Sequence, residues 1–142
     1  MKLSQELVAV LVLATFATLA GAQEKQIKHT TVPHTSAASG RDMYLNYCAV
    51  CHGKDGRGSG PAADALKLPP ADLTALAAKN GGKFPSNHVA AVIRGEANLP
   101  AHGNKEMPVW GPIFWKMSGG HESEVQQRIT NLTNFVESLQ VK

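Results

Sequence analysis

The sequence has few aromatic residues, only two cysteines and no long hydrophobic segment after its first 22 residues. Aromatic residues make up 6% of the 142 positions, and the 14 lysines and arginines are scattered rather than interleaved with aromatic side chains. This pattern argues against a nucleic-acid-binding protein. No later segment is apolar enough to span a membrane. We find no internal repeat and no strand pattern, so one small helical domain with a formal net charge of +3 is expected.

The first 22 residues predict a cleaved secretory signal. Lys2 precedes an apolar run over residues 7–20, and the small residues Ala20-Gly21-Ala22 come before polar Gln23. The run is shorter than the roughly 20 apolar residues that a bilayer core requires, which disfavours an uncleaved membrane anchor. We therefore expect a bacterial protein that is exported, normally to the periplasm, and soluble after cleavage.

The rest of the chain divides into a lead-in and one domain. Residues 23–38 are polar and without a hydrophobic period, which predicts a flexible lead-in, and residues 39–142 form the domain. Residues 96–120 contain three prolines and several glycines, so we expect an extended loop there. Helices are predicted from a Ser39 cap up to Cys48, briefly over 62–67 and 71–79, over 86–94, and over 125–139 with a Ser123 cap.

Both cysteines fall in the segment Cys48-Ala49-Val50-Cys51-His52. A C-x-x-C-H arrangement is the attachment signature of a c-type haem. Two thiols three positions apart can form thioethers with the two vinyl groups on one edge of a porphyrin, and the adjacent imidazole is then brought to the iron. The motif therefore predicts one covalently bound haem c with His52 as an iron ligand.

Three other interpretations of the motif remain open at this point. A zinc site needs two further ligands, and the only suitably spaced pair, His29 and His34, lies upstream in the lead-in. A thioredoxin-like redox pair needs a strand before the motif, which the sequence does not predict. A structural disulfide is compatible with an exported protein but leaves His52 without a role.

The whole domain resembles class I cytochrome c. In that family a first helix leads into the C-x-x-C-H motif and is crossed by the C-terminal helix. Gly40 and Tyr44 match the small and aromatic positions of the first helix, and Leu132 and Phe135 match their counterparts on the last. A glycine at the crossing lets two helices approach closely. The resemblance implies an all-α fold of short helices and long loops wrapped around one haem.

The resemblance also implies roles for residues outside the motif. The carbonyl of Pro61 would accept a hydrogen bond from the imidazole of His52 and so orient it. Met107, in a Met-Pro loop typical of the family, would be the sixth ligand of the iron, with Met117 as the fallback. Trp110 would donate to a haem propionate.

Histidine and methionine together fill the coordination sphere, so the resemblance implies an electron carrier rather than an enzyme. We expect one-electron, outer-sphere transfer with transient redox partner proteins, namely a dehydrogenase, oxidase or reductase of a respiratory or dehydrogenase chain. Two alternatives stay open. One is a haem enzyme or gas sensor with an open sixth position, and the other is the electron-accepting subunit of a larger dehydrogenase or oxidase complex.

Overall fold

The computed structural model describes residues 32–97 and 107–141. The chain divides after Thr31 into two units, and the described residues all belong to the second. The predicted signal at 1–22 and the first part of the predicted lead-in, 23–31, lie outside the described residues. None of the described helices is long and apolar enough to cross a membrane.

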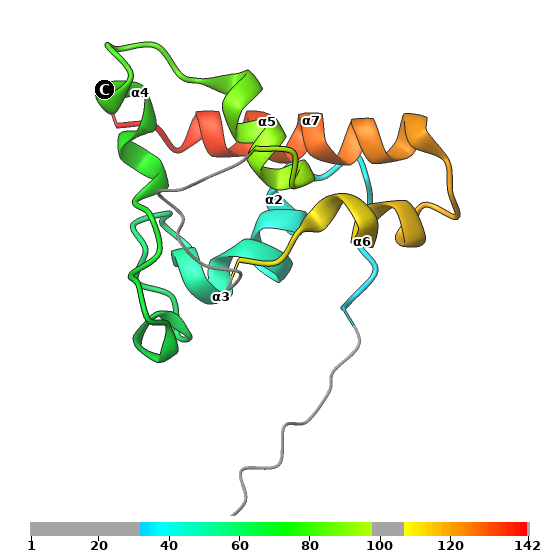
Figure 1. The fold of residues 1–142 in the computed structure, drawn as a ribbon, viewed down its shortest axis with the longest axis horizontal. Coiled ribbons are helices and arrows are strands. Elements are labelled where there is room, and N and C mark those ends of the chain that lie inside the picture. Colours follow the sequence, from blue (N-terminus) through cyan, green and yellow to red (C-terminus); the bar gives the residue numbers. More distant parts are fainter. Residues whose placement is uncertain (1–31, 98–106, 142) are drawn as a thin grey trace, which may run out of the picture. The chain divides into compact units, whose positions relative to one another are not determined.

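The described residues form helices and no strand (Figure 1), so the predicted all-α fold is confirmed. In chain order the elements are α2 (Gly40–Met43), the π-helix η2 (Tyr44–Cys48), α3 (Ala49–His52), the 3-10 helices η3 (Ala63–Ala65) and η4 (Leu73–Ala75), α4 (Leu76–Lys79), α5 (Ser86–Arg94), α6 (Trp110–Met117) and α7 (Glu122–Ser138).

The long helix α7 is the element on which α2, α5 and α6 pack (Figure 1). A Cβ atom built on Gly40 of α2 would stand 2.0 Å from the backbone oxygen of Asn131 and 3.1 Å from Cβ of Phe135. The rings of Tyr44 and Phe135 lie next to this contact, with centroids 5.0 Å apart. The predicted crossing of the first and last helices, with glycine at the closest approach, is therefore confirmed.

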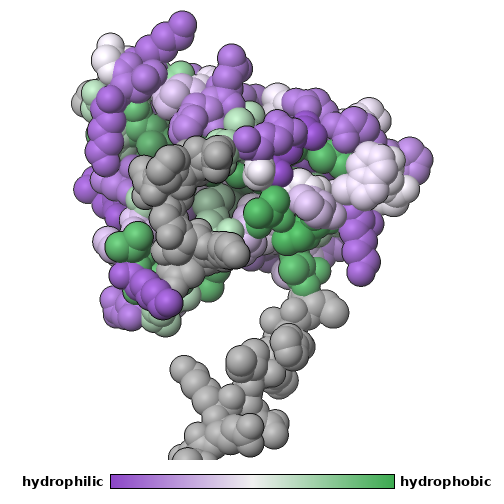
Figure 2. Space-filling view, viewed as in Figure 1, coloured by the Kyte–Doolittle hydropathy of each residue, from purple (hydrophilic) through white to green (hydrophobic). Residues whose placement is uncertain are grey.

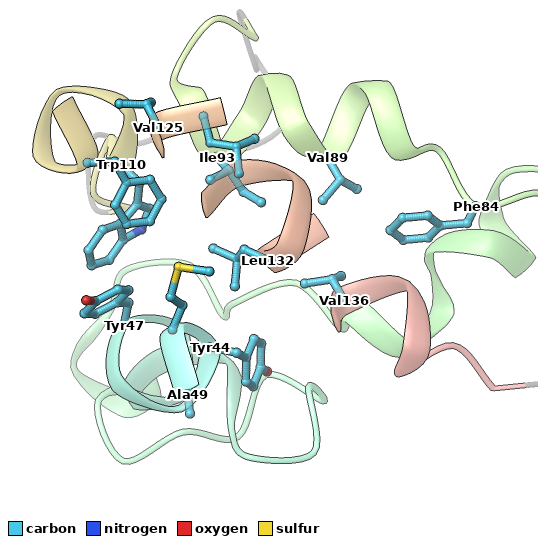
Figure 3. Close-up of a cluster of buried hydrophobic side chains, with 13 residues drawn as sticks. Tyr44, Tyr47, Ala49, Phe84, Val89, Ile93, Trp110, Val125, Leu132 and Val136 are labelled. Atoms are coloured by element: carbon cyan, nitrogen blue, oxygen red, sulfur yellow. The ribbon is translucent and has the colours of Figure 1, made fainter. Parts of the chain in front are cut away.

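A single cluster of buried side chains fills the space between these helices (Figure 3). Tyr47 stacks on Trp110 with ring centroids 4.9 Å apart, and Phe114 lies beside both rings. Leu132 of α7 is fully buried. The other members are Met43, Tyr44, Ala49, Phe84, Val89, Ile93, Val125, Ile129 and Val136.

The exposed side chains of some helices are polar, and those of others are apolar. From the side drawn in Figure 2, hydrophilic side chains lie over α5 and α7, and hydrophobic ones gather over α6. Val109, which precedes α6, and Trp115 within it are both half exposed. The apolar segment 109–115 thus contributes both to the core and to the surface.

The expected extended loop over 96–120 is wrong in its second half, where α6 forms. Pro112 is the third residue of this helix. The N–H groups of the first helical turn have no partner within the helix, so a proline there removes no hydrogen bond. The helix also crosses α5 closely, because a Cβ on Gly111 would stand 2.5 Å from the backbone oxygen of Arg94. At α7, the N-cap residue is His121 rather than the predicted Ser123.

The last residues of the predicted flexible lead-in are bound to the domain. The buried guanidinium of Arg128 donates to the carbonyl oxygen of Thr35 at 2.9 Å, and the side-chain amide of Asn131 donates to that of Ala37 at 2.8 Å. The hydroxyl groups of Thr35 and Tyr47 are hydrogen-bonded at 2.7 Å. These two donors come from α7, and the hydroxyl of Tyr47 in η2 donates to the carbonyl oxygen of Pro33 at 2.7 Å. The ordered domain therefore begins before Ser39.

Candidate functional site

The Cys48–His52 segment lies where η2 gives way to α3. A glycine-rich loop folds back against it, so that the backbone N–H groups of Gly58 and Gly60 donate to the carbonyl oxygens of His52 and Cys51, at 2.8 and 3.0 Å. A Cβ on Gly60 would stand 2.5 Å from a backbone oxygen of the same segment, so this approach requires glycine. The loop therefore fixes the backbone from which both thiols and the imidazole project.

The imidazole of His52 is oriented by a backbone carbonyl. Its Nδ1 lies 3.0 Å from the carbonyl oxygen of Ala71. Because a carbonyl only accepts, Nδ1 carries the hydrogen in this contact, and the tautomer of the ring is fixed. The carbonyl at this nitrogen is that of Ala71 rather than that of the predicted Pro61, which is exposed.

The two thiols are part-buried, and neither is in a disulfide. Burial raises the pKa of Cys48 to about 12, with a further increase from the neighbouring Cys51, and burial also raises the pKa of Cys51. A dithiol redox centre needs the opposite, a lowered thiol pKa. Among the described residues no group of three or more His, Cys, Asp or Glu side chains could hold a metal ion, so these residues do not form the alternative zinc site.

Cys48 and His52 line a cavity that holds about 640 Å³ of atom-free space, including its open mouth. Its walls come from the segment after the motif loop and from α5 and α7. The other lining residues are Ala71, Leu73, Leu76, His88, Val89, Val92, Ile93, Met107, Leu132 and Val136.

Of the three methionines in the described residues, Met107 is the one that lines this cavity. Met117 lies elsewhere, with its Sδ 3.5 Å from the hydroxyl of Tyr47. Met43 is fully buried in the core. The geometry thus brings Met107 to the same cavity as His52 and leaves the fallback Met117 outside it.

Trp110 is not among the residues that line the cavity, although the sequence predicts that it contacts a haem propionate. Its indole is buried and packs against the rings of Tyr47 and Phe114, with centroids 4.9 and 5.7 Å away. The structure therefore places Trp110 in the core cluster beside the motif helix.

A comparison with protein families decides the identity of the fold. A family model described as cytochrome C oxidase, cbb3-type, subunit III matches residues 35–116, a range that holds both cysteines, His52 and Met107. The chain belongs to this family. Comparisons with curated proteins and with solved structures gave no match. The prediction of a class I c-type cytochrome is thereby confirmed, and membership implies haem-based electron transfer.

The site of this cytochrome fits a haem c. The burial that raises the pKa of both thiols also suits uncharged thioether sulfurs. The imidazole of His52, which lines the cavity together with Cys48, is already oriented through Nδ1. The cavity walls are mainly aliphatic, as a porphyrin face requires. The residues present therefore match the cofactor that the family implies.

Sequence reasoning missed two contributors to the site. Ala71 acts through its backbone, so its residue type carries no signal, although the preceding Pro69-Pro70 marks a rigid turn. His88 lines the cavity, yet the sequence assigned it no role. Its position four residues before Val92 places both on one face of α5, and this spacing is the signal that could have found it.

Proposed function

We propose that this cytochrome is a periplasmic electron carrier that holds one haem c through Cys48 and Cys51, with His52 and Met107 as the axial ligands. The observation that carries the proposal is that the motif and Met107, 55 positions further along the chain, line one cavity. A histidine and a methionine at one aliphatic site are the ligand pair of electron-transfer cytochromes. Cysteines that stayed free thiols and a methionine that only filled the core would have no reason to line the same cavity.

When bound, the haem supplies iron that accepts and releases one electron without a change of ligands. The protein's own residues do the rest. Ala71 holds the His52 imidazole in one orientation and increases its donor strength through the Nδ1 hydrogen bond. Leu132 and Val136 of α7 and Val89 of α5 exclude water from the cavity walls. With His52 and Met107 both holding the iron, no coordination position would be left for a substrate.

Export to the periplasm and a respiratory or dehydrogenase chain are part of the same proposal. The N-terminal pattern of Lys2, the apolar run and Ala20-Gly21-Ala22 supports export. The description of the family as an oxidase subunit supports a partner in a respiratory chain. We expect brief encounters of small area, as is usual for redox pairs. Crosslinking in the periplasm identifies the donor and acceptor, and a partner captured in stoichiometric yield would indicate a complex subunit instead of a free carrier.

Replacement of Met107 tests the ligand assignment. In the haem-loaded protein, Met107→Ala should abolish the red-region charge-transfer band from methionine to ferric iron, and it should lower the reduction potential. Met117→Ala is the matched control and should leave the band in place, because Met117 lies outside the cavity. Loss of the band in Met117→Ala with its retention in Met107→Ala would refute the assignment.

Carbon monoxide distinguishes the carrier from a haem enzyme or gas sensor. The reduced wild-type protein should not bind carbon monoxide at neutral pH, because Met107 closes the sixth position. Met107→Ala should bind it readily. Rapid binding to the wild-type protein would favour the sensor or enzyme.

A further inference from the structure

One polar side chain at the cavity has no part in the proposed function. Eight of the twelve described lining residues are aliphatic, and Cys48, His52 and Met107 are assigned to the haem. The remaining one is His88, in the first turn of α5. Val89, its neighbour in the chain, is buried in the core, whereas His88 is exposed. His88 therefore stands at the rim of an otherwise apolar cavity.

His88 also borders a second hollow, which is more polar than the first. This open depression holds about 830 Å³ of atom-free space and is lined by Lys83, Ser86, Asn87 and His88 among others. No carboxylate among the described residues forms an ion pair with Lys83. His88 is the residue common to the two hollows, so it marks the place where the apolar cavity meets a more polar surface that carries Lys83.

The chemistry of haem gives such a boundary a role. A haem has two propionates, which are ionised at neutral pH, and an ionised carboxylate is strongly disfavoured inside an aliphatic cavity without a partner. Propionates therefore lie at a rim that offers hydrogen-bond donors or positive charge. Among the described residues, the border between the two hollows offers the imidazole of His88, and the ammonium of Lys83 lies in the second hollow beside it.

We propose that His88 donates a hydrogen bond to a haem propionate, with the ammonium of Lys83 adding positive charge from the adjoining hollow. This inference rests on the proposed function, because it requires a haem in the cavity. It replaces Trp110, which packs in the core, as the propionate donor. A hydrogen bond to a propionate offsets its negative charge, and that charge favours ferric over ferrous iron. His88 is thus a positioning residue that also raises the reduction potential.

The test uses three variants of the haem-loaded protein. His88→Leu removes the donor, His88→Gln keeps a donor on a side chain of similar reach, and His34→Leu is the control, since His34 is exposed and lines neither hollow. We expect a lower midpoint potential for His88→Leu, a potential closer to wild type for His88→Gln, and no change for His34→Leu. In the reduced wild-type protein, nuclear Overhauser contacts should join the His88 ring protons to a propionate methylene.

Two results would overturn this proposal while leaving a covalently bound haem in place. One is an unchanged potential in His88→Leu together with no contact between the His88 ring and a propionate. The other is loss of a bis-histidine spectrum on replacement of His88, which would make His88 an iron ligand. Absence of covalent haem from the wild-type protein would overturn the proposed function and this inference together.

Discussion

The crossing of α2 and α7 leaves no room for a side chain at Gly40, and Gly40→Ala measures how tightly it is packed. The new Cβ would lie 2.0 Å from the backbone oxygen of Asn131, whereas real Cβ contacts essentially never fall below 3.0 Å. The helices must therefore separate by about 1 Å. Overpacking of this kind costs about 1–3 kcal/mol, and the better helix propensity of alanine offsets at most about 1 kcal/mol. We expect a net loss of about 1–2 kcal/mol in the free energy of unfolding.

Urea unfolding of the haem-loaded protein, followed by far-ultraviolet circular dichroism and by haem absorbance, measures this loss. Arg41→Ala is the matched control, because Arg41 is the next residue of α2 and is exposed. Its effect should stay within about 0.5 kcal/mol, as is usual for surface substitutions. A Gly40→Ala variant as stable as the wild type or more stable would refute the close crossing.

Three further substitutions test other contacts. Arg128→Met removes the donor to the buried Thr35 carbonyl, so we expect the free energy of unfolding to fall by about 2 kcal/mol and residues 32–38 to be cut faster by a protease. An unchanged free energy of unfolding and an unchanged rate of proteolysis would contradict this role. Thr133→Val should raise the free energy of urea unfolding by about 1 kcal/mol, because no described residue forms a hydrogen bond with the buried hydroxyl of Thr133. A lower free energy of unfolding in this variant would contradict that assignment. Hydrogen bonds from the side chain and backbone of Thr74 lower the pKa of Asp72, so its carboxylate stabilises the fold above the unfolded pKa of about 3.9 and less as the pH falls through the lowered folded value. Asp72→Ala should therefore lower the free energy of unfolding by about 1 kcal/mol at pH 7 and by little at pH 3. An equal loss at the two pH values in urea unfolding would contradict this linkage.

The sequence was most informative where chemistry or packing is local. The C-x-x-C-H segment identifies its own ligands, and the apolar stripe of the last helix shows as a period because one face of α7 is buried. The match of Gly40 and Tyr44 with Phe135 was found through the family resemblance, and the steric requirement at the crossing explains it.

The missed features depend on distant partners. The Ala71 carbonyl meets His52 from 19 positions away, and any carbonyl of the intervening loop has the same chemistry, so the sequence could not choose between Ala71 and Pro61. Thr35 is held by Arg128, 93 positions further on, so nothing in the polar lead-in predicts its order. The helix α6 was hidden by Pro112, which is tolerated because it falls in the first turn.

Intact-mass spectrometry after denaturation tests the central claim most directly. The chain should be produced in a bacterium with the machinery for c-type haem attachment, alongside a Cys48→Ala, Cys51→Ala variant. We expect the wild-type chain to retain the added mass of one haem under denaturing conditions and to have no thiol that reacts with an alkylating reagent, while the variant retains none. A wild-type chain of apoprotein mass with two reactive thiols would contradict the account.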